Sequence, residues 1–269
     1  MLAEAFAFVA GGYLVLLGAM GVMQRDLIYH PSEEISDPVT AGVPEMAPVP
    51  VNAADGVRVT SWYAAPSRPD APTVVLFHGN ARTISARAHK ARKLLDAGYG
   101  VFLAEYRGYG GNPGSPSEKG FYADARAALA WLRLRGVSDE RMVLYGESLG
   151  SGVAVQMASE HAAAALVLEA PFTRLPDLAP PIVPPPLARL MMLDHYDTLS
   201  KIGRLSMPLL VMHGGADWVV PITMGREVLA AAQSASHREG LFIEAAGHND
   251  LWNHGVGERV VDFLDRMAG

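Results

Sequence analysis

The chain has 269 residues, half of them hydrophobic, and its formal net charge at pH 7 is −6. This length suits one large α/β domain or two small ones with a sizeable buried core, and the acidic balance argues against nucleic acid as a partner. Because the sequence contains no cysteine, it excludes a disulfide framework, a thiolate metal site and a cysteine nucleophile.

The first predicted element is an apolar helix over residues 5–23, a stretch that carries no charged residue. As a helix it is long enough to cross a bilayer core of about 30 Å, and we expect Arg25 and Asp26 to end it. A membrane anchor is the favoured interpretation. A helix that packs on the domain or on a second copy is one alternative. A cleaved signal peptide is another, but Glu4 and the lack of an early Lys or Arg argue against it.

The predicted organisation is an N-terminal helix over residues 1–25 followed by one domain over residues 26–269. Arg25 follows the apolar segment, and a basic residue there favours the cytoplasmic side for the domain over residues 26–269. The N-terminal helix, or the insertion described below, could also join two copies in a homodimer.

Prolines dominate residues 24–50 and predict an extended connection there. After it, strand-like and helix-like segments alternate. The predicted strands cover residues 57–63, 73–77, 100–105, 142–145, 165–169, 209–213 and 241–244. The predicted helices cover residues 84–97, 120–135, 151–159, 187–193, 224–232 and 256–267. The alternation predicts an α/β fold whose mostly parallel central sheet carries helices on both faces and its ligand site beyond the carboxyl ends of the strands.

Residues 146–150 read Gly-Glu-Ser-Leu-Gly and lie between a predicted strand and a predicted helix. A G-x-S-x-G in that position is typical of the nucleophile elbow of α/β-hydrolases, a strained turn that raises the serine above the sheet at a helix N-terminus. The motif therefore predicts Ser148 as a nucleophile. A chance match in a glycine-rich chain is the alternative, and the flanking elements argue against it.

A serine hydroxyl needs a base, and the base needs an acid that orients it. After Ser148, two strand ends offer these partners: Asp217 as the acid and His248 as the base. Both follow the chain order of nucleophile, acid and histidine. The alternatives to Asp217 are Asp194, Asp197 and Asp250, or an aspartate that only shapes its loop. The other histidines are His254 as a rival base, His213 as a buried support of its turn, and His195 as a substrate contact.

An oxyanion needs two hydrogen-bond donors. The backbone N–H of Leu149 is one candidate, and the N–H of Asn80, in the loop after strand 73–77, is the other. In the next loop we expect Arg107 and Tyr109 to be structural, with substrate contact as the alternative. The histidines lack metal-ligand spacing and the sequence holds no nucleotide-binding motif, so we expect no cofactor and no metal.

With these motifs the chain resembles the α/β-hydrolases. More narrowly, it is similar to the Bem46-like, membrane-tethered serine hydrolases and to the bacterial esterases related to mammalian ABHD13- and ABHD17-type proteins. The stretches that carry the resemblance are residues 27–31, 77–81, 106–110, 116–118, 146–150, 213–217, 220–221 and 247–248. The resemblance implies Ser148, Asp217 and His248 as the triad and residues 171–207 as a short cap over the site.

The chain departs from the family pattern at Glu105, where we expect aspartate, and in the proline density of the cap. We expect both departures to affect cap shape and substrate choice and to leave the reaction unchanged.

The predicted function is a carboxylic ester hydrolase that acts on a small-molecule ester with a short to medium acyl chain. An acyl-protein or acyl-CoA thioesterase is the close alternative, and a membrane-tethered protein that only binds is a third. Apolar residues of the cap are predicted either to line an acyl pocket or simply to pack the cap: Leu187, Leu190, Met191, Met192 and Leu193.

Overall fold

An eight-stranded sheet lies at the centre of the computed structural model, which describes residues 1–268. Its strands are β1 (Ala47–Asn52), β2 (Arg58–Ala64), β3 (Thr73–Phe77), β4 (Gly100–Ala104), β5 (Met142–Glu147), β6 (Ala165–Glu169), β7 (Leu209–Gly214) and β8 (Arg238–Ile243). They follow the order β1-β2-β4-β3-β5-β6-β7-β8 across the sheet. β2 pairs antiparallel with both β1 and β4, and all other neighbours pair in parallel.

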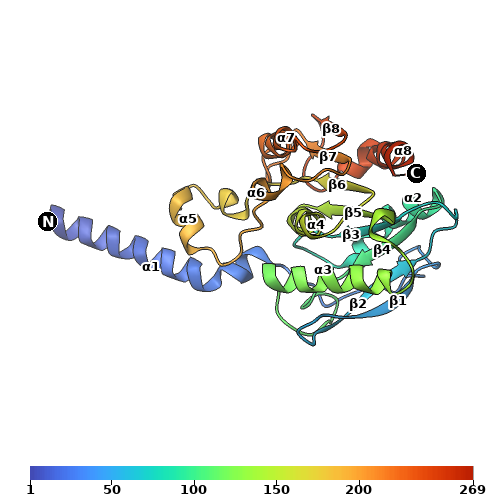
Figure 1. Ribbon diagram of the computed structural model, residues 1–269. Helices are drawn as coiled ribbons and strands as arrows, with labels where there is room; N and C mark the ends of the chain where they lie inside the picture. The colour runs from blue at the N-terminus through green and yellow to red at the C-terminus, as the bar shows by residue number, and fades with distance from the viewer. Residues whose placement is uncertain (269) are drawn as a thin grey trace.

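Helices cover both faces of this sheet (Figure 1). The α-helices are α1 (Leu2–Ile28), α2 (Ala88–Asp96), α3 (Glu118–Arg133), α4 (Leu149–Glu160), α5 (Pro185–Met191), α6 (Leu199–Ile202), α7 (Ile222–Ala231) and α8 (Val256–Met267). Side chains of α3, α4 and α7 enter the core on one face, and those of α2 and α8 enter the core on the other. The predicted α/β architecture is therefore confirmed.

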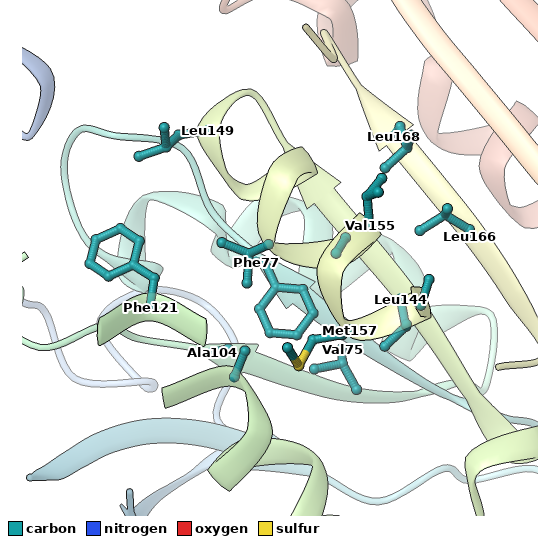
Figure 2. Close-up of a cluster of buried hydrophobic side chains, with 14 of the residues drawn as sticks. Val75, Phe77, Ala104, Phe121, Leu144, Leu149, Val155, Met157, Leu166 and Leu168 are labelled. Atoms are coloured by element: carbon teal, nitrogen blue, oxygen red, sulfur yellow. The ribbon is translucent and has the colours of Figure 1, made fainter. Parts of the chain in front are cut away.

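The central strands are apolar throughout because both of their faces are buried. In β3, Val75 and Phe77 enter one core whereas Val74 and Leu76 enter the other, and all four are fully buried. Figure 2 shows Val75 and Phe77 close to Met157 of α4, which covers that face. This two-sided burial holds the carboxyl ends of the parallel strands in one rigid edge.

The predicted bounds of the central strands agree with the structure, and the edge of the sheet does not. Residues 73–77 and 165–169 coincide with β3 and β6. The extended connection predicted up to residue 50 is too long, because its last residues form the edge strand β1. Pro48 and Pro50 lie within β1, where a proline is tolerated because an edge strand leaves part of its backbone unpaired.

The helix α1 extends beyond its predicted limits and projects from the domain (Figure 1). The expectation that Arg25 and Asp26 end it is wrong, because α1 continues to Ile28. Arg25 lies in the last turn, where a cation is favourable, and its guanidinium pairs with Asp194 at 3.1 Å. The stretch Phe6–Ile28 has a mean hydropathy of 2.0, and only 6% of its most apolar 18 residues are buried in the protein. It is long and apolar enough to cross a membrane.

The interval between β6 and β7 forms an insertion that contains a 3-10 turn (Leu175–Leu178), α5 and α6. We call residues 171–207 the cap. Its helix α5 lies beside α1 (Figure 1), where Val183 and Ala188 form a small buried cluster with Leu17 of α1. The predicted helix 187–193 corresponds to α5, which starts and ends two residues earlier, at Pro185 and Met191.

Candidate active site

The candidate nucleophile lies in the turn between β5 and α4. Ser148 has φ +50° and ψ −117°, a conformation that costs energy for a residue with a side chain. Its N–H donates to the Glu169 carbonyl at 2.8 Å, which ties the turn to β6. A Cβ on Gly146 would lie 2.8 Å from the Ala154 Cβ, and one on Gly150 would overlap the Phe77 carbonyl. Close backbone approach therefore requires glycine on both sides of the serine.

The structure brings the three residues of the predicted triad together. The Ser148 Oγ lies 3.0 Å from Nε2 of His248, and Nδ1 of the same ring lies 2.7 Å from Oδ2 of Asp217. An ionised carboxylate can only accept, so Nδ1–H donates to Asp217 and Nε2 is left to accept the serine proton. One imidazole thus connects a hydroxyl at one strand end with a carboxylate at another.

Asp217 is held as an anion by the groups that surround it. Burial alone would raise its pKa, but hydrogen bonds from His213, His248 and the Val220 N–H outweigh burial and set the pKa well below the usual range for aspartate. A carboxylate that stays ionised near neutral pH can stabilise an imidazolium on His248.

The other aspartates and histidines have structural partners of their own. Nε2 of His213 is 3.3 Å from Asp217 and 2.9 Å from the Val220 carbonyl, so this buried ring supports the turn as expected. Nε2 of His195 is 3.0 Å from the Met192 carbonyl. The remaining rivals pair as follows: Asp194 with Arg25, Asp197 with Arg174, Asp250 with the Gly247 N–H, and His254 with Asp250 at 3.9 Å.

Two backbone N–H groups beside Ser148 are available as donors. Neither the Leu149 N–H nor the Asn80 N–H donates to an acceptor within residues 1–268. A Cβ on Gly79 would lie 3.4 Å from the Ser148 Cβ, so the loop that carries Asn80 passes directly over the serine. The structure therefore places Leu149 and the loop that carries Asn80 beside the candidate nucleophile.

Three hydrogen bonds hold Asn80 in place. Its carbonyl accepts from the His30 N–H at 2.9 Å and from the Tyr109 hydroxyl at 2.7 Å, and its side-chain Nδ2 donates to the Ile28 carbonyl at 2.8 Å. Tyr109 was expected to be structural, and its hydroxyl supports this loop. The bond from Asn80 to Ile28, the last residue of α1, has no signal in the sequence.

Glu105 lies beneath the same loop. Its Oε1 is 2.6 Å from Nε2 of His78, its Oε2 accepts from the Ile84 N–H at 3.0 Å, and the side chains of Glu105 and His78 are both fully buried. We expected the departure from aspartate at this position to affect the cap. The structure shows that Glu105 supports the His78–Gly79 turn from the side of the sheet, and its effect on cap shape and substrate choice stays a prediction.

A buried charge cluster that the sequence did not predict lies behind the elbow. Nζ of Lys90 lies 2.6 Å from both Glu147 and Glu169, and Arg87 also pairs with Glu147. The Tyr145 hydroxyl donates to Glu169. Burial raises the pKa of Glu147, but Lys90 and Arg87 outweigh it and hold the pKa well below the usual range. We call these five residues the elbow cluster. The basic residues at positions 87 and 90 of one helical stretch were its only signal.

The apolar cap residues separate into two groups. Met191 and Met192 line a cavity of about 210 Å³ between α1 and the cap, which we call the α1–cap cavity. Leu187 packs against the small cluster around Leu17. Leu190 and Leu193 are 82% and 64% exposed and do not line this cavity.

A fold with this strand order, an elbow serine and an adjoining histidine and aspartate defines the class of α/β-hydrolase scaffolds. The model of the serine aminopeptidase S33 family matches residues 68–193. The uncharacterized protein Rv2307c of Mycobacterium tuberculosis is 40% identical over 246 residues, which cover 91% of this chain and 86% of that protein. The chain therefore belongs to the α/β-hydrolase superfamily, in one family with this mycobacterial protein.

Solved structures resemble this one in fold. The Pyrococcus furiosus esterase Pf2001 superimposes with a TM-score of 0.73 at 21% identity and covers 90% of this chain and 98% of its own. An alpha-beta hydrolase from Vibrio vulnificus gives a TM-score of 0.70 at 18% identity, with 86% and 88% covered. The butyrate-bound esterase Est2 of Thermogutta terrifontis gives 0.65 at 19% identity, with 83% and 94% covered.

Proposed function

We propose that the protein is a serine hydrolase of carboxylic esters and a Bem46-like member of its superfamily. Ser148 Oγ attacks the acyl carbonyl carbon while its proton passes to Nε2 of His248. The N–H groups of Leu149 and Asn80 stabilise the resulting oxyanion. Collapse of this intermediate breaks the bond to the alcohol, which leaves with the proton from His248, and the acyl group stays on Ser148. Asp217 orients the imidazole and stabilises its charge.

Water completes the cycle. A water molecule gives a proton to His248 and attacks the acyl-enzyme, and the carboxylic acid leaves as Ser148 regains its proton. The observation that carries this proposal is the hydrogen-bonded series Ser148–His248–Asp217, with distances of 3.0 Å and 2.7 Å. The N–H groups of Leu149 and Asn80 have no acceptor within residues 1–268. The printed names of structural neighbours, several of them esterases, add support for the ester class.

A fluorophosphonate probe tests the nucleophile, because it phosphonylates only an activated serine. We expect labelling of the wild-type chain and none of Ser148→Ala. We further expect His248→Ala to lower kcat for a p-nitrophenyl ester by about 10⁴-fold, whereas His254→Ala, a matched histidine outside the series, changes kcat less than twofold. Folded wild-type protein that takes up no probe would favour a protein that only binds. Matched oxygen ester and thioester substrates separate an esterase from a thioesterase.

We also propose that α1 anchors the protein in a membrane. Support comes from its apolar stretch Phe6–Ile28 and from side chains such as Phe8 and Val15, which are 84% and 74% exposed. Detergent phase partitioning of the full chain tests the anchor. Wild type is expected in the detergent phase, and a double variant Phe8→Lys/Val15→Lys is expected in the aqueous phase. Wild-type protein that remains aqueous contradicts the anchor.

A further inference from the structure

The α1–cap cavity is an apolar site, and one of its lining residues, Ile28, is bonded to Asn80 of the candidate oxyanion loop. Its wall combines residues of α1 with residues of the cap, among them Leu17, Gly21, Ile28, Leu175, Ala188 and Met191. The one amide side chain in the wall, Gln24, is used within the protein. Its Nε2 donates to the Gly21 carbonyl at 2.7 Å and its Oε1 accepts from the Leu193 N–H at 2.7 Å. The cavity therefore offers a surface for an apolar ligand.

One end of the cavity adjoins the candidate active site. Ile28 lines the cavity, and its carbonyl accepts from Nδ2 of Asn80, whose backbone N–H is a proposed oxyanion donor. Leu149, the other donor, shares a buried apolar cluster with Leu175, which also lines the cavity. Met192 lines the cavity and packs against the same cluster. Leu149 and the cavity residues Leu175 and Met192 thus belong to one apolar core.

The helix α1 is fixed to the cap along the cavity. Arg25 pairs with Asp194 at 3.1 Å near one end, and the Tyr13 hydroxyl donates to the Ile182 carbonyl at 2.9 Å near the other. The hydrogen bond that the Leu193 N–H donates to Gln24 lies between these two contacts. An anchor joined by a mobile linker would need none of these contacts. Here these contacts hold α1 in place as part of the cavity wall.

The cavity lies at the depth of a bilayer if α1 crosses one. The 23 residues of Phe6–Ile28 span about 34 Å as a helix, close to the thickness of a hydrocarbon core of about 30 Å. The α1 residues in the cavity wall come from positions 17–28, the half next to the domain. On the outer surface of the same region, Val22 of α1 is 87% exposed and Leu190 of the cap is 82% exposed. Both α1 and the cap therefore carry exposed apolar side chains in the region that would face lipid.

We propose that the α1–cap cavity binds the fatty acyl chain of an ester that enters from the adjoining bilayer leaflet, so that α1 is a wall of the acyl site as well as an anchor. This inference rests on the proposed ester hydrolysis by Ser148. A volume of about 210 Å³ is below the roughly 300–1,000 Å³ of sites that enclose a whole drug-sized ligand. It suits a single hydrocarbon chain, with the ester group at the Ile28 end beside Asn80.

A pair of glycines on α1 supplies a matched test. A Cβ on Gly21 would lie 3.5 Å from Cε of Met191, so a phenylalanine there enters the cavity, whereas Gly18 faces open space. The full chain in phosphatidylcholine vesicles is assayed with p-nitrophenyl octanoate and p-nitrophenyl acetate. Because each buried methylene favours binding by about fourfold, we expect wild type to prefer octanoate in kcat/KM by at least tenfold. Gly21→Phe should lower this preference at least tenfold, and Gly18→Phe less than twofold.

Enlarging the cavity tests the same assignment in the opposite direction. Met191→Ala removes side-chain volume from the wall, and we expect the ratio of kcat/KM for dodecanoate over octanoate to rise at least threefold. If Gly21→Phe does not fold, Met191→Ala alone tests whether the α1–cap cavity is the acyl site. An equal effect of the two phenylalanines, no response to Met191→Ala, or no wild-type preference for octanoate would overturn the assignment.

Entry from the leaflet is tested with 4-methylumbelliferyl oleate built into vesicles. We expect hydrolysis to be at least tenfold faster when the ester and the protein share the same vesicles than when they occupy separate ones. Equal rates would overturn entry from the bilayer. Ester hydrolysis that persists in Ser148→Ala would instead overturn the proposed function, so the two failures are distinguishable.

Discussion

Removal of Lys90 should destabilise the fold strongly, because it leaves a buried carboxylate without a cation. The Lys90 side chain is 5% exposed and lies 2.6 Å from both Glu147 and Glu169. In Lys90→Met, Glu147 keeps Arg87, but Glu169 keeps only the neutral donors Tyr145 and Trp252. Breaking a buried ion pair by removing one partner costs about 3–5 kcal/mol.

The cost can be read as a change in melting temperature. For a domain of this size, 1 kcal/mol corresponds to about 2–4 °C, so Lys90→Met should lower Tm by roughly 6–20 °C. Calorimetry on the full chain in detergent measures the shift. The matched control is Lys93→Met, one turn further along α2, where Nζ pairs with Glu258 at 2.7 Å and the two side chains are 38% and 64% exposed. Solvent screens an exposed pair and leaves it little effect on stability, so Tm should fall far less than in Lys90→Met.

A second substitution separates electrostatics from packing. Adding Glu169→Gln to Lys90→Met removes the uncompensated charge, so the double variant should recover part of the lost Tm. Equal shifts in Lys90→Met and Lys93→Met, or no recovery in the double variant, would refute the electrostatic account of the elbow cluster. The Glu169 carbonyl accepts from the Ser148 N–H. A loss of activity at temperatures where Lys90→Met is folded would therefore indicate that the turn around Ser148 has changed.

The α/β fold and the meeting of Ser148, Asp217 and His248 at one edge of the sheet could be predicted because each depends on local sequence. The central strands are continuous apolar runs, since both faces of each strand are buried. The elbow needs glycine at positions 146 and 150, and a substitution there would collide with the backbone. Asp217 and His248 each follow a predicted strand directly. Strand ends of a parallel sheet meet at one edge, so these positions predict nearness without a model of the whole molecule.

The supports of the site could not be predicted, because they join distant parts of the chain. Lys90 and Glu169 are 79 positions apart, and Asn80 and Ile28 are 52 apart. A buried lysine and an exposed lysine on one helix look alike in sequence, and only packing distinguishes Lys90 from Lys93. The role of α1 was hidden for the same reason. Its apolar composition predicts a membrane-length helix and says nothing of which face meets the cap.

Three further predictions concern the site. Asp217→Asn should lower kcat by about 10⁴-fold, because the amide lets His248 take the wrong tautomer, and a loss below tenfold would remove Asp217 from the series. Tyr109→Phe deletes one hydrogen bond to the Asn80 carbonyl, worth about 0.5–1.5 kcal/mol, so kcat should fall about two- to tenfold with little change in KM, and an effect on KM alone would contradict support of the oxyanion loop. The last concerns acid. Because Lys90 and Arg87 hold the pKa of Glu147 below its usual range, its stabilisation is complete above the unfolded pKa of about 4.3 and is lost as pH falls through the lower folded pKa. Between pH 5 and 3, Tm should therefore fall further in wild type than in Glu147→Gln, and equal falls in the two proteins would show that this carboxylate contributes nothing to acid sensitivity.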